Sequence, residues 1–127
     1  MTTTAAQLVA NAKDMVESVD VDMAAREIAD GALLVDLRED AERRATGAIP
    51  GALHVPRGLL EFKADPAAST HVADLDKGRR TILYCAVGGR SALAAVSLRG
   101  LGYTDVAHLD GGFQAWLDAG RPTEHVD

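Results

Sequence analysis

Cysteine is almost absent from this chain, and its scarcity excludes several kinds of protein. One cysteine, Cys85, occurs among 127 residues. A disulfide within the chain needs two cysteines, and a zinc site of the thiolate-rich kind needs at least two. The histidines lie far apart in the sequence, with no cysteine or carboxylate at ligand spacing. We therefore predict no disulfide framework, no metal site and no bound cofactor.

Basic residues and long apolar runs are also scarce. Thirteen lysines and arginines stand against nineteen aspartates and glutamates, which gives a formal net charge of −6. Nucleic-acid-binding proteins take much of their affinity from basic side chains on phosphates, so this balance argues against a nucleic-acid partner. No apolar run approaches the ~20 residues of a membrane span, and the first residues do not resemble a signal peptide. We expect a cytoplasmic protein without a membrane partner, in which a lone thiol stays reduced.

Short apolar runs alternate with segments of helical spacing along the chain. These patterns predict helices over residues 4–17, 23–29, 39–45, 91–101 and 113–119, with Asp22 as the cap of the second. They predict strands over residues 19–21, 33–36, 52–55, 81–84 and 106–109. Strands separated by helices favour parallel pairing with helices on both faces of the sheet. The predicted fold class is therefore α/β, a three-layer sandwich around a mostly parallel sheet.

The surroundings of Cys85 favour a reactive thiolate. Cys85 follows directly after a predicted strand, at the sheet edge where α/β proteins bind ligands. The helix that begins at Ser91 presents unpaired backbone N–H groups and the positive end of its dipole, and Arg90 adds a fixed positive charge. Gly88 and Gly89 let the intervening amides turn toward one anion. This segment supplies a nucleophile, an anion cradle and a cation, although a buried structural cysteine is the alternative interpretation.

Three separated stretches resemble the signatures of the single-domain rhodanese family of sulfurtransferases. They are, in chain order, LVDLRE (34–39) with GAIPGA (47–52), CAVGGRS (85–91), and GGFQAW (111–116) with Ala119, Gly120 and Pro122. Their order and spacing agree with the family throughout. The resemblance implies a rhodanese-like three-layer sandwich for residues 19–127, with residues 1–18 as an N-terminal helical extension packed on that domain.

In this family a cysteine thiolate takes sulfur from a donor and passes it to an acceptor. The resemblance implies that Cys85 attacks the outer sulfur of a small-molecule donor such as thiosulfate and becomes a persulfide. The sulfur then passes to cyanide, to a thiol or to a sulfur-accepting protein. Backbone amides of the active-site loop would cradle the sulfur, and Arg90 and Ser91 would brace the loop, which comprises Ala86, Val87, Gly88, Gly89, Arg90 and Ser91.

Two features of the loop bear on its chemistry. Ala86 and Val87 replace the polar or basic residues of many thiosulfate-using members, so we expect thiosulfate to be a poor donor. Cysteine-dependent phosphatases place five residues between Cys and Arg, whereas four separate Cys85 from Arg90, which makes phosphatase activity the weaker hypothesis. A non-catalytic binding or regulatory module of the same fold is a further alternative. The uncharged rim and the N-terminal helix favour it, and the intact Cys85 and Arg90 argue against it.

Two arginines outside the loop, Arg57 and Arg38, are candidates for binding an anionic donor. For Arg38 a salt bridge with Glu39 or Glu42 is the favoured alternative, because most such pairs are structural or solvated. For Arg57 neither interpretation is preferred. Other residues receive structural interpretations: a solvated face for helix 39–45, a loop brace for Asp36, ordinary hydrogen bonds on strands for His54 and His108, and core positions for Phe113 and Trp116.

Overall fold

A parallel β-sheet lies between two layers of helices. The computed structural model describes residues 2–127 and contains five strands in the order β1-β5-β4-β2-β3, with every neighbouring pair parallel. The strands are β1 (Glu17–Val19), β2 (Leu33–Asp36), β3 (Leu53–His54), β4 (Thr81–Tyr84) and β5 (Val106–Leu109). The helices are α1 (Ala5–Met15), α2 (Val21–Ala29), α3 (Asp40–Thr46), the 3-10 turn η1 (Arg57–Leu59), α4 (Leu60–Ala64), α5 (Gly89–Gly100) and α6 (Gly112–Asp118). The predicted α/β sandwich is confirmed.

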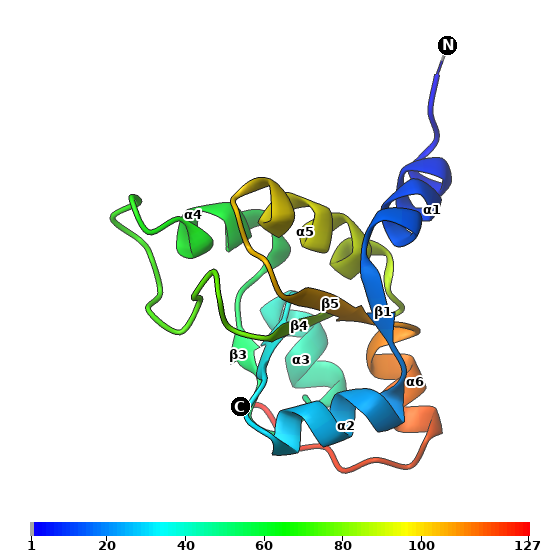
Figure 1. Cartoon of the computed structure of the whole chain (residues 1–127). Coiled ribbons are helices and arrows are strands. Elements are labelled where there is room, and N and C mark those ends of the chain that lie inside the picture. Colours follow the sequence, from blue (N-terminus) through cyan, green and yellow to red (C-terminus); the bar gives the residue numbers. More distant parts are fainter. Residues whose placement is uncertain (1) are drawn as a thin grey trace.

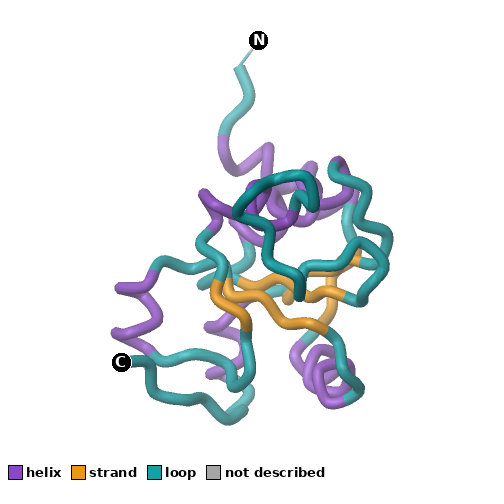
Figure 2. Tube along the Cα trace, turned by 90° about the vertical axis from the view of Figure 1, so that its left-hand side faces the viewer, coloured by secondary structure: helices purple, strands orange, loops and turns teal. Residues whose placement is uncertain are grey.

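The two helical layers cover opposite faces of the sheet (Figures 1 and 2). Helices α1, α4 and α5 lie on one side, and α2, α3 and α6 lie on the other. All residues of β2 and β4 are buried, as expected for central parallel strands covered on both faces. Successive side chains alternate between two apolar clusters, so Leu83 packs on the α5 side, whereas Ile82 and Tyr84 pack beside Phe113 and Trp116 of α6. The predicted core positions of Phe113 and Trp116 are confirmed.

Several predicted boundaries are wrong by a few residues. The first helix, predicted to reach residue 17, ends at Met15, and Glu17 begins β1. Asp20, not Asp22, caps α2, because its side chain accepts a hydrogen bond of 2.8 Å from the backbone N–H of Met23. Either aspartate is an acceptable cap by residue type, and choosing the earlier one moves the preceding strand from 19–21 to β1. Helix α5 begins at Gly89 rather than at Ser91, so Arg90 lies in its first turn. The strand predicted at 52–55 is reduced to β3.

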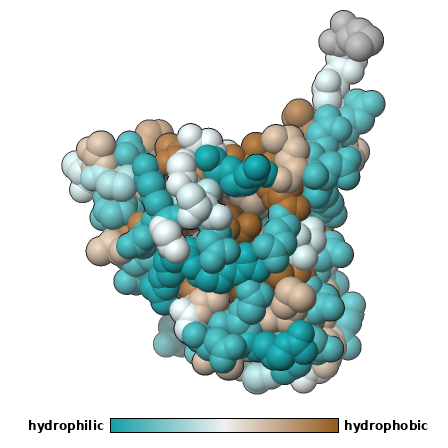
Figure 3. Space-filling model, in the orientation of Figure 1, coloured by the Kyte–Doolittle hydropathy of each residue, from teal (hydrophilic) through white to brown (hydrophobic). Residues whose placement is uncertain are grey.

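Helix α1 packs against α5 and reaches the loop that follows β4. Thr4 and Gln7 form a capping box at its start, and Ala12 is buried. A side chain added at Gly89 would touch Val9 of α1, and one added at Gly88 would touch Lys13. Apolar surface lies over the junction of α1 with α5 (Figure 3). Helix α1 is thus a neighbour of the Cys85 loop, although it lies outside the sheet.

The predicted boundary between residues 18 and 19 falls inside β1, which pairs with β5 along its whole length. The division of the chain into an extension and a domain stays a prediction. None of the helices within residues 2–127 has the length and apolar content needed to cross a bilayer.

Candidate active site

The loop between β4 and α5 holds Cys85 at the carboxyl edge of the sheet. Cys85 is 1% exposed and follows directly after Tyr84, the last residue of β4. Gly88 has φ +112°, a left-handed conformation that glycine adopts without a Cβ clash. This conformation brings the backbone N–H of Gly88 to 3.1 Å from the Cys85 Sγ, to which it donates a hydrogen bond. Ser91, in the first turn of α5, places its Oγ 3.7 Å from the same sulfur.

Of the predicted ring of backbone amides around the sulfur, the structure contains one contact. Among residues 2–127, the Gly88 N–H is the loop amide that meets the Cys85 Sγ at hydrogen-bond distance. The ring of amides from Ala86 to Arg90 therefore stays a prediction.

Arg90 is paired with Glu42 of α3 across the mouth of the loop. Its two terminal nitrogens, Nη1 and Nη2, lie 2.8 Å from Glu42 Oε2 and Oε1 in a bidentate arrangement. The hydrogen bonds from Arg90 lower the pKa of Glu42 to about 2, and Glu42 is the main cause that raises the pKa of Arg90. The interpretation of Glu42 as part of a solvated helix face was wrong. Much of the positive charge at this loop is balanced before any substrate binds.

Arg38 is buried in a network of its own and points away from solvent. Its side chain is 2% exposed and donates to both oxygens of Asp36, at 3.1 and 2.9 Å, and to Thr46 and the Gly47 carbonyl. The predicted salt bridge exists, but its partner is Asp36, so the assignment to Glu39 or Glu42 was wrong. The sequence argument paired Arg38 with acidic residues of the helix that follows it. In the fold, the carboxylate that faces Arg38 belongs to Asp36, two residues earlier at the end of β2.

Asp36 joins the end of β2 to the surrounding elements. Burial alone would raise the pKa of Asp36, but hydrogen bonds from Arg38 and Tyr84 outweigh burial and hold that pKa below its ordinary value. The Tyr84 hydroxyl donates to Asp36 Oδ2 at 2.7 Å, and Arg43 Nε lies 3.1 Å from the same oxygen. Because Tyr84 precedes Cys85, this network fixes the strand end from which the loop departs. The brace predicted for Asp36 is confirmed.

Arg57 lies away from the sulfur. It pairs with Glu61 at 3.0 and 3.1 Å and donates to Ser97 Oγ at 3.2 Å. Ser97 lies about 9 Å further along α5 than Ser91, at 1.5 Å per helical residue. The structure therefore does not bring Arg57 to the Cys85 loop, and its candidacy for substrate binding finds no support in this arrangement.

Comparison with known proteins assigns the family. A family model described as a rhodanese-like domain matches residues 20–119. The chain belongs to the rhodanese-like family. It is 36% identical over 110 residues to a sulfurtransferase of Allochromatium vinosum, covering 85% of this chain and 94% of that one. It is 40% identical over 97 residues to the thiosulfate sulfurtransferase GlpE of Pseudomonas savastanoi pv. phaseolicola, covering 76% of this chain and 81% of that one.

A solved structure supports the same fold for this rhodanese-like chain. A Rhodopseudomonas palustris protein of unknown function, described as a possible tyrosine phosphatase, superposes with a TM-score of 0.90 and 34% identity. The match covers 98% of this chain and 96% of that one. Several other relatives are longer proteins, of which the chain matches less than two thirds.

The start of α6 holds the rhodanese-like loop from the other side. The backbone N–H groups of Phe113 and Gln114 donate to the carbonyls of Cys85 and Ala86 at 2.9 and 3.0 Å. A Cβ at Gly112 would stand 2.5 Å from the Cys85 carbonyl oxygen, far inside contact distance. Glycine is needed there because two backbone segments touch. The sequence signal for this contact was the Gly111-Gly112 pair, which belongs to the GGFQAW stretch (111–116) that resembles the rhodanese signature, but the resemblance did not predict its contact with Cys85.

A cavity of about 290 Å³ opens beside the loop. Its walls are mostly apolar, and Glu42 is its acidic residue; the lining comprises Arg38, Glu42, Ala45, Thr46, Ala86, Val87, Phe113, Gln114 and Leu117. Val87 is 67% exposed at the rim. A molecule that approaches Cys85 from this side meets apolar side chains rather than free positive charge.

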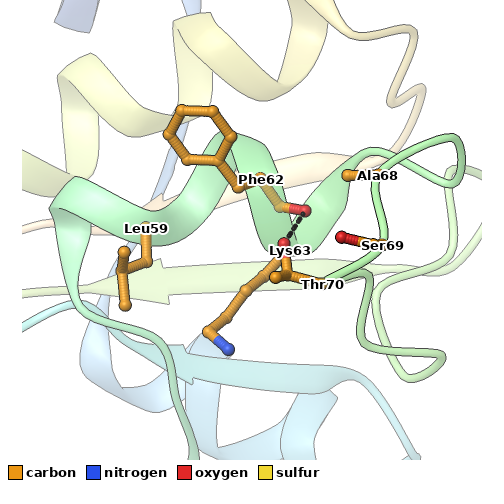
Figure 4. A pocket seen from close by; sticks show the side chains of 6 residues that line it. All are labelled: Leu59, Phe62, Lys63, Ala68, Ser69 and Thr70. Carbon is orange, nitrogen blue, oxygen red and sulfur yellow. Dashed lines mark hydrogen bonds between the residues drawn. The ribbon is translucent and has the colours of Figure 1, made fainter.

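A larger cavity, of about 530 Å³, lies far from the sulfur beside α4 (Figure 4). Leu59, Phe62 and Lys63 line one side of it, and Thr70 Oγ1 donates to the Phe62 carbonyl at 3.1 Å on the other. The end of α4 is tied to Tyr103, whose hydroxyl donates to the Ala64 carbonyl. Tyr103 follows the C-terminal end of α5, whereas Cys85 precedes its N-terminal end. This cavity has no part in the Cys85 site.

Proposed function

We propose that this rhodanese-like chain is a sulfurtransferase that carries a sulfane sulfur as a persulfide on Cys85. The observation that carries the proposal is the position of the Cys85 Sγ, which receives the Gly88 N–H at 3.1 Å beneath the N-terminus of α5. Fixed donors stabilise a sulfur anion without reorganising during the reaction. The sulfurtransferases among its relatives support the same activity.

Two displacement steps account for the transfer. In the first, the Cys85 thiolate attacks the transferable sulfur of the donor and a new S–S bond forms. The donor's bond to that sulfur, S–S in thiosulfate or an organic persulfide and C–S in mercaptopyruvate, breaks with its electron pair on the leaving group, which is sulfite for thiosulfate and the enolate of pyruvate for mercaptopyruvate. In the second, an acceptor thiolate or cyanide attacks the outer persulfide sulfur, and the Cys85 thiolate leaves. A covalent intermediate divides one difficult transfer into two easier ones. Because the chain has one cysteine, the acceptor is an external molecule.

The loop mouth favours a donor other than a free dianion. Arg90 is already engaged by Glu42, and the rim presents Ala86 and Val87. A dianion such as thiosulfate finds little unpaired positive charge here, whereas an organic persulfide with an apolar arm can pack in the adjacent cavity. We therefore expect thiosulfate to load Cys85 more slowly than an organic sulfane donor does.

Mass spectrometry of the intact protein tests the proposal. Treatment with thiosulfate, mercaptopyruvate or an organic persulfide should add one sulfur atom to the wild type and none to Cys85→Ser. Addition of cyanide should then remove that sulfur and release thiocyanate. If no donor in this panel adds sulfur to Cys85, the proposal is wrong, and a non-catalytic binding module becomes the better interpretation.

Phosphatase activity is the competing chemistry, since a structural neighbour is described as a possible tyrosine phosphatase. Four residues separate Cys85 from Arg90, which gives a tighter loop than a tetrahedral phosphate requires. In addition, Glu42 places a carboxylate where a phosphate would meet Arg90. We expect no Cys85-dependent hydrolysis of p-nitrophenyl phosphate, and turnover of that substrate that disappears in Cys85→Ser would contradict this expectation.

A further inference from the structure

A continuous chain of polar side chains links the buried Cys85 to the protein surface. Ser91 Oγ lies 3.7 Å from Cys85 Sγ and 3.1 Å from Nδ1 of His108 on β5. The other ring nitrogen of His108, Nε2, lies 2.9 Å from Ser18 Oγ on β1. Cys85, Ser91 and His108 are buried, whereas Ser18 is exposed. The pairing of β1 with β5 places Ser18 opposite His108 and so completes the chain.

His108 can take part in this chain in either of two directions. Burial is the main cause that lowers the pKa of His108; Asp110 raises it and Lys13 lowers it, and the net direction keeps the ring neutral near pH 7. A neutral imidazole carries one N–H, on Nδ1 or on Nε2, and the other nitrogen accepts. Because serine hydroxyls rotate, both tautomers satisfy Ser91 on one side and Ser18 on the other.

We infer that His108 conducts the thiol proton of Cys85 to the surface by exchanging its tautomer. In the thiol form, Cys85 S–H donates to Ser91 Oγ, the Ser91 hydroxyl donates to Nδ1, and Nε2–H donates to Ser18. On ionisation, the thiol proton passes to Ser91, the Ser91 proton passes to Nδ1, the Nε2 proton passes to Ser18, and Ser18 releases its proton to water. One proton leaves, the electron pair stays on Sγ, and His108 is neutral before and after.

The reversed chain also stabilises the thiolate. The Ser91 hydroxyl then donates to the Cys85 Sγ, beside the Gly88 N–H, while Nδ1–H of His108 holds Ser91 in that orientation. His108 is thus a positioning residue that acts on the sulfur through Ser91. The inference rests on the proposed function in one respect, that Cys85 is the nucleophile.

The Gly88 carbonyl is the competing acceptor in this chain. It lies 3.2 Å from Ser91 Oγ, so the Ser91 hydrogen can remain on it. In that case His108 would keep one tautomer whatever the state of Cys85. Three charged residues also act on this site: Arg90 of α5 faces the sulfur, and Lys13 and Asp110 face His108. Each of them affects the charge of Cys85 or His108, so all three are kept unchanged in every variant that is compared.

Nitrogen-15 NMR of His108 in the full chain tests the tautomer exchange. The pH range is the one over which the rate of Cys85 alkylation by iodoacetamide rises. The wild type should change from Nε2–H to Nδ1–H across that range, and Cys85→Ala should keep one tautomer throughout. A single tautomer in the wild type, or a doubly protonated ring that accompanies the thiolate, would overturn the inference. Neither outcome involves a sulfur donor, so failure of sulfur loading would contradict the proposed function alone.

Ser18, the exposed last member of this row of hydrogen-bonded side chains, provides a second test that leaves the core intact. Ser18→Ala removes the final carrier and the donor to Nε2, and the matched control, Ser69→Ala, changes an exposed serine beside the distant cavity. We expect alkylation of Cys85 at pH 7 to slow about fivefold in Ser18→Ala, the effect of one lost hydrogen bond, and to be unchanged in Ser69→Ala. Equal rates in the two variants would mean that the hydrogen bond between Ser18 and His108 does not stabilise the thiolate, and would overturn the inference.

Discussion

Among single residues, Glu42 controls how much positive charge a substrate meets at the loop. Glu42→Gln removes the carboxylate that engages Arg90 while keeping an oxygen for the Glu39 N–H, which Glu42 accepts at 2.8 Å. We expect kcat/KM for thiosulfate to rise roughly fivefold, the size of a partly exposed ion pair. The rise should be smaller for an uncharged organic donor, because such a donor gains little from a free guanidinium. Steady-state kinetics with both donors measure the difference.

Asp40→Asn is the matched control for that prediction. It removes the same charge from α3, but Asp40 pairs with the exposed Arg44 instead of with Arg90. An equal gain for thiosulfate in both variants would show that overall charge, rather than the release of Arg90, governs the use of this donor.

Among the elements, α6 approaches the loop so closely that a Cβ at Gly112 would lie 2.5 Å from the Cys85 carbonyl oxygen. Gly112→Ala forces a Cβ against the Cys85 carbonyl, whereas Gly120→Ala introduces the same positive-φ strain in open space. Left-handed strain costs about 1–2 kcal/mol in either variant, and overpacking adds about 2 kcal/mol more at Gly112. Urea denaturation should therefore find Gly112→Ala clearly less stable than Gly120→Ala. Equal stabilities would mean that the loop yields to α6 at little cost.

The sequence predicted individual strands and the Cys85 loop, because the residues that form each of them are neighbours along the chain. It did not predict contacts between residues that lie far apart along the chain. The ranges 33–36, 81–84 and 106–109 match β2, β4 and β5 residue for residue, because each is an apolar run bounded by polar or turn residues. The loop from Cys85 to Ser91 was predictable for a similar reason, since one short segment contains it.

The pairs Glu42–Arg90 and Ser18–His108 were beyond sequence reasoning. Each joins residues far apart along the chain, and each depends on how two elements are placed in space: α3 beside the start of α5, and β1 in register with β5. A charged helix residue and a strand histidine carry no local mark of such a partner. His108 was expected to make ordinary hydrogen bonds, and it does make them, but their continuation to Cys85 depends on how the fold places β5 beside the start of α5.

For the whole molecule, the lowered pKa values of the Glu42 and Asp36 carboxyl groups predict that the fold is sensitive to acid. Hydrogen bonds from Arg90 lower the pKa of Glu42 from its ordinary value of 4.5 to about 2 in the folded protein, and the pKa of Asp36 is also lowered. Above pH 4.5 their contribution to stability is fully present, and it is lost as pH falls toward 2, because the unfolded chain then binds more protons than the folded one. The free energy of unfolding should fall over this range. Glu42→Gln should fall less steeply than the wild type, and parallel curves would contradict the assignment.

Helix α1 sets the rate at which the loop around Cys85 can open. Val9 and Lys13 of α1 lie beside Gly89 and Gly88. We therefore expect the loop to open more readily once α1 has detached from α5. An isolated helix of 11 residues is marginal in water, and α1 contributes one fully buried side chain, Ala12, so it should detach far more often than the sheet unfolds. Hydrogen exchange should therefore replace the Gly88 amide proton at the rate at which α1 detaches, while the β4 amides exchange only on global unfolding. The lifetime of the sulfur's surroundings is then set by a helix that contributes no atom to the chemistry.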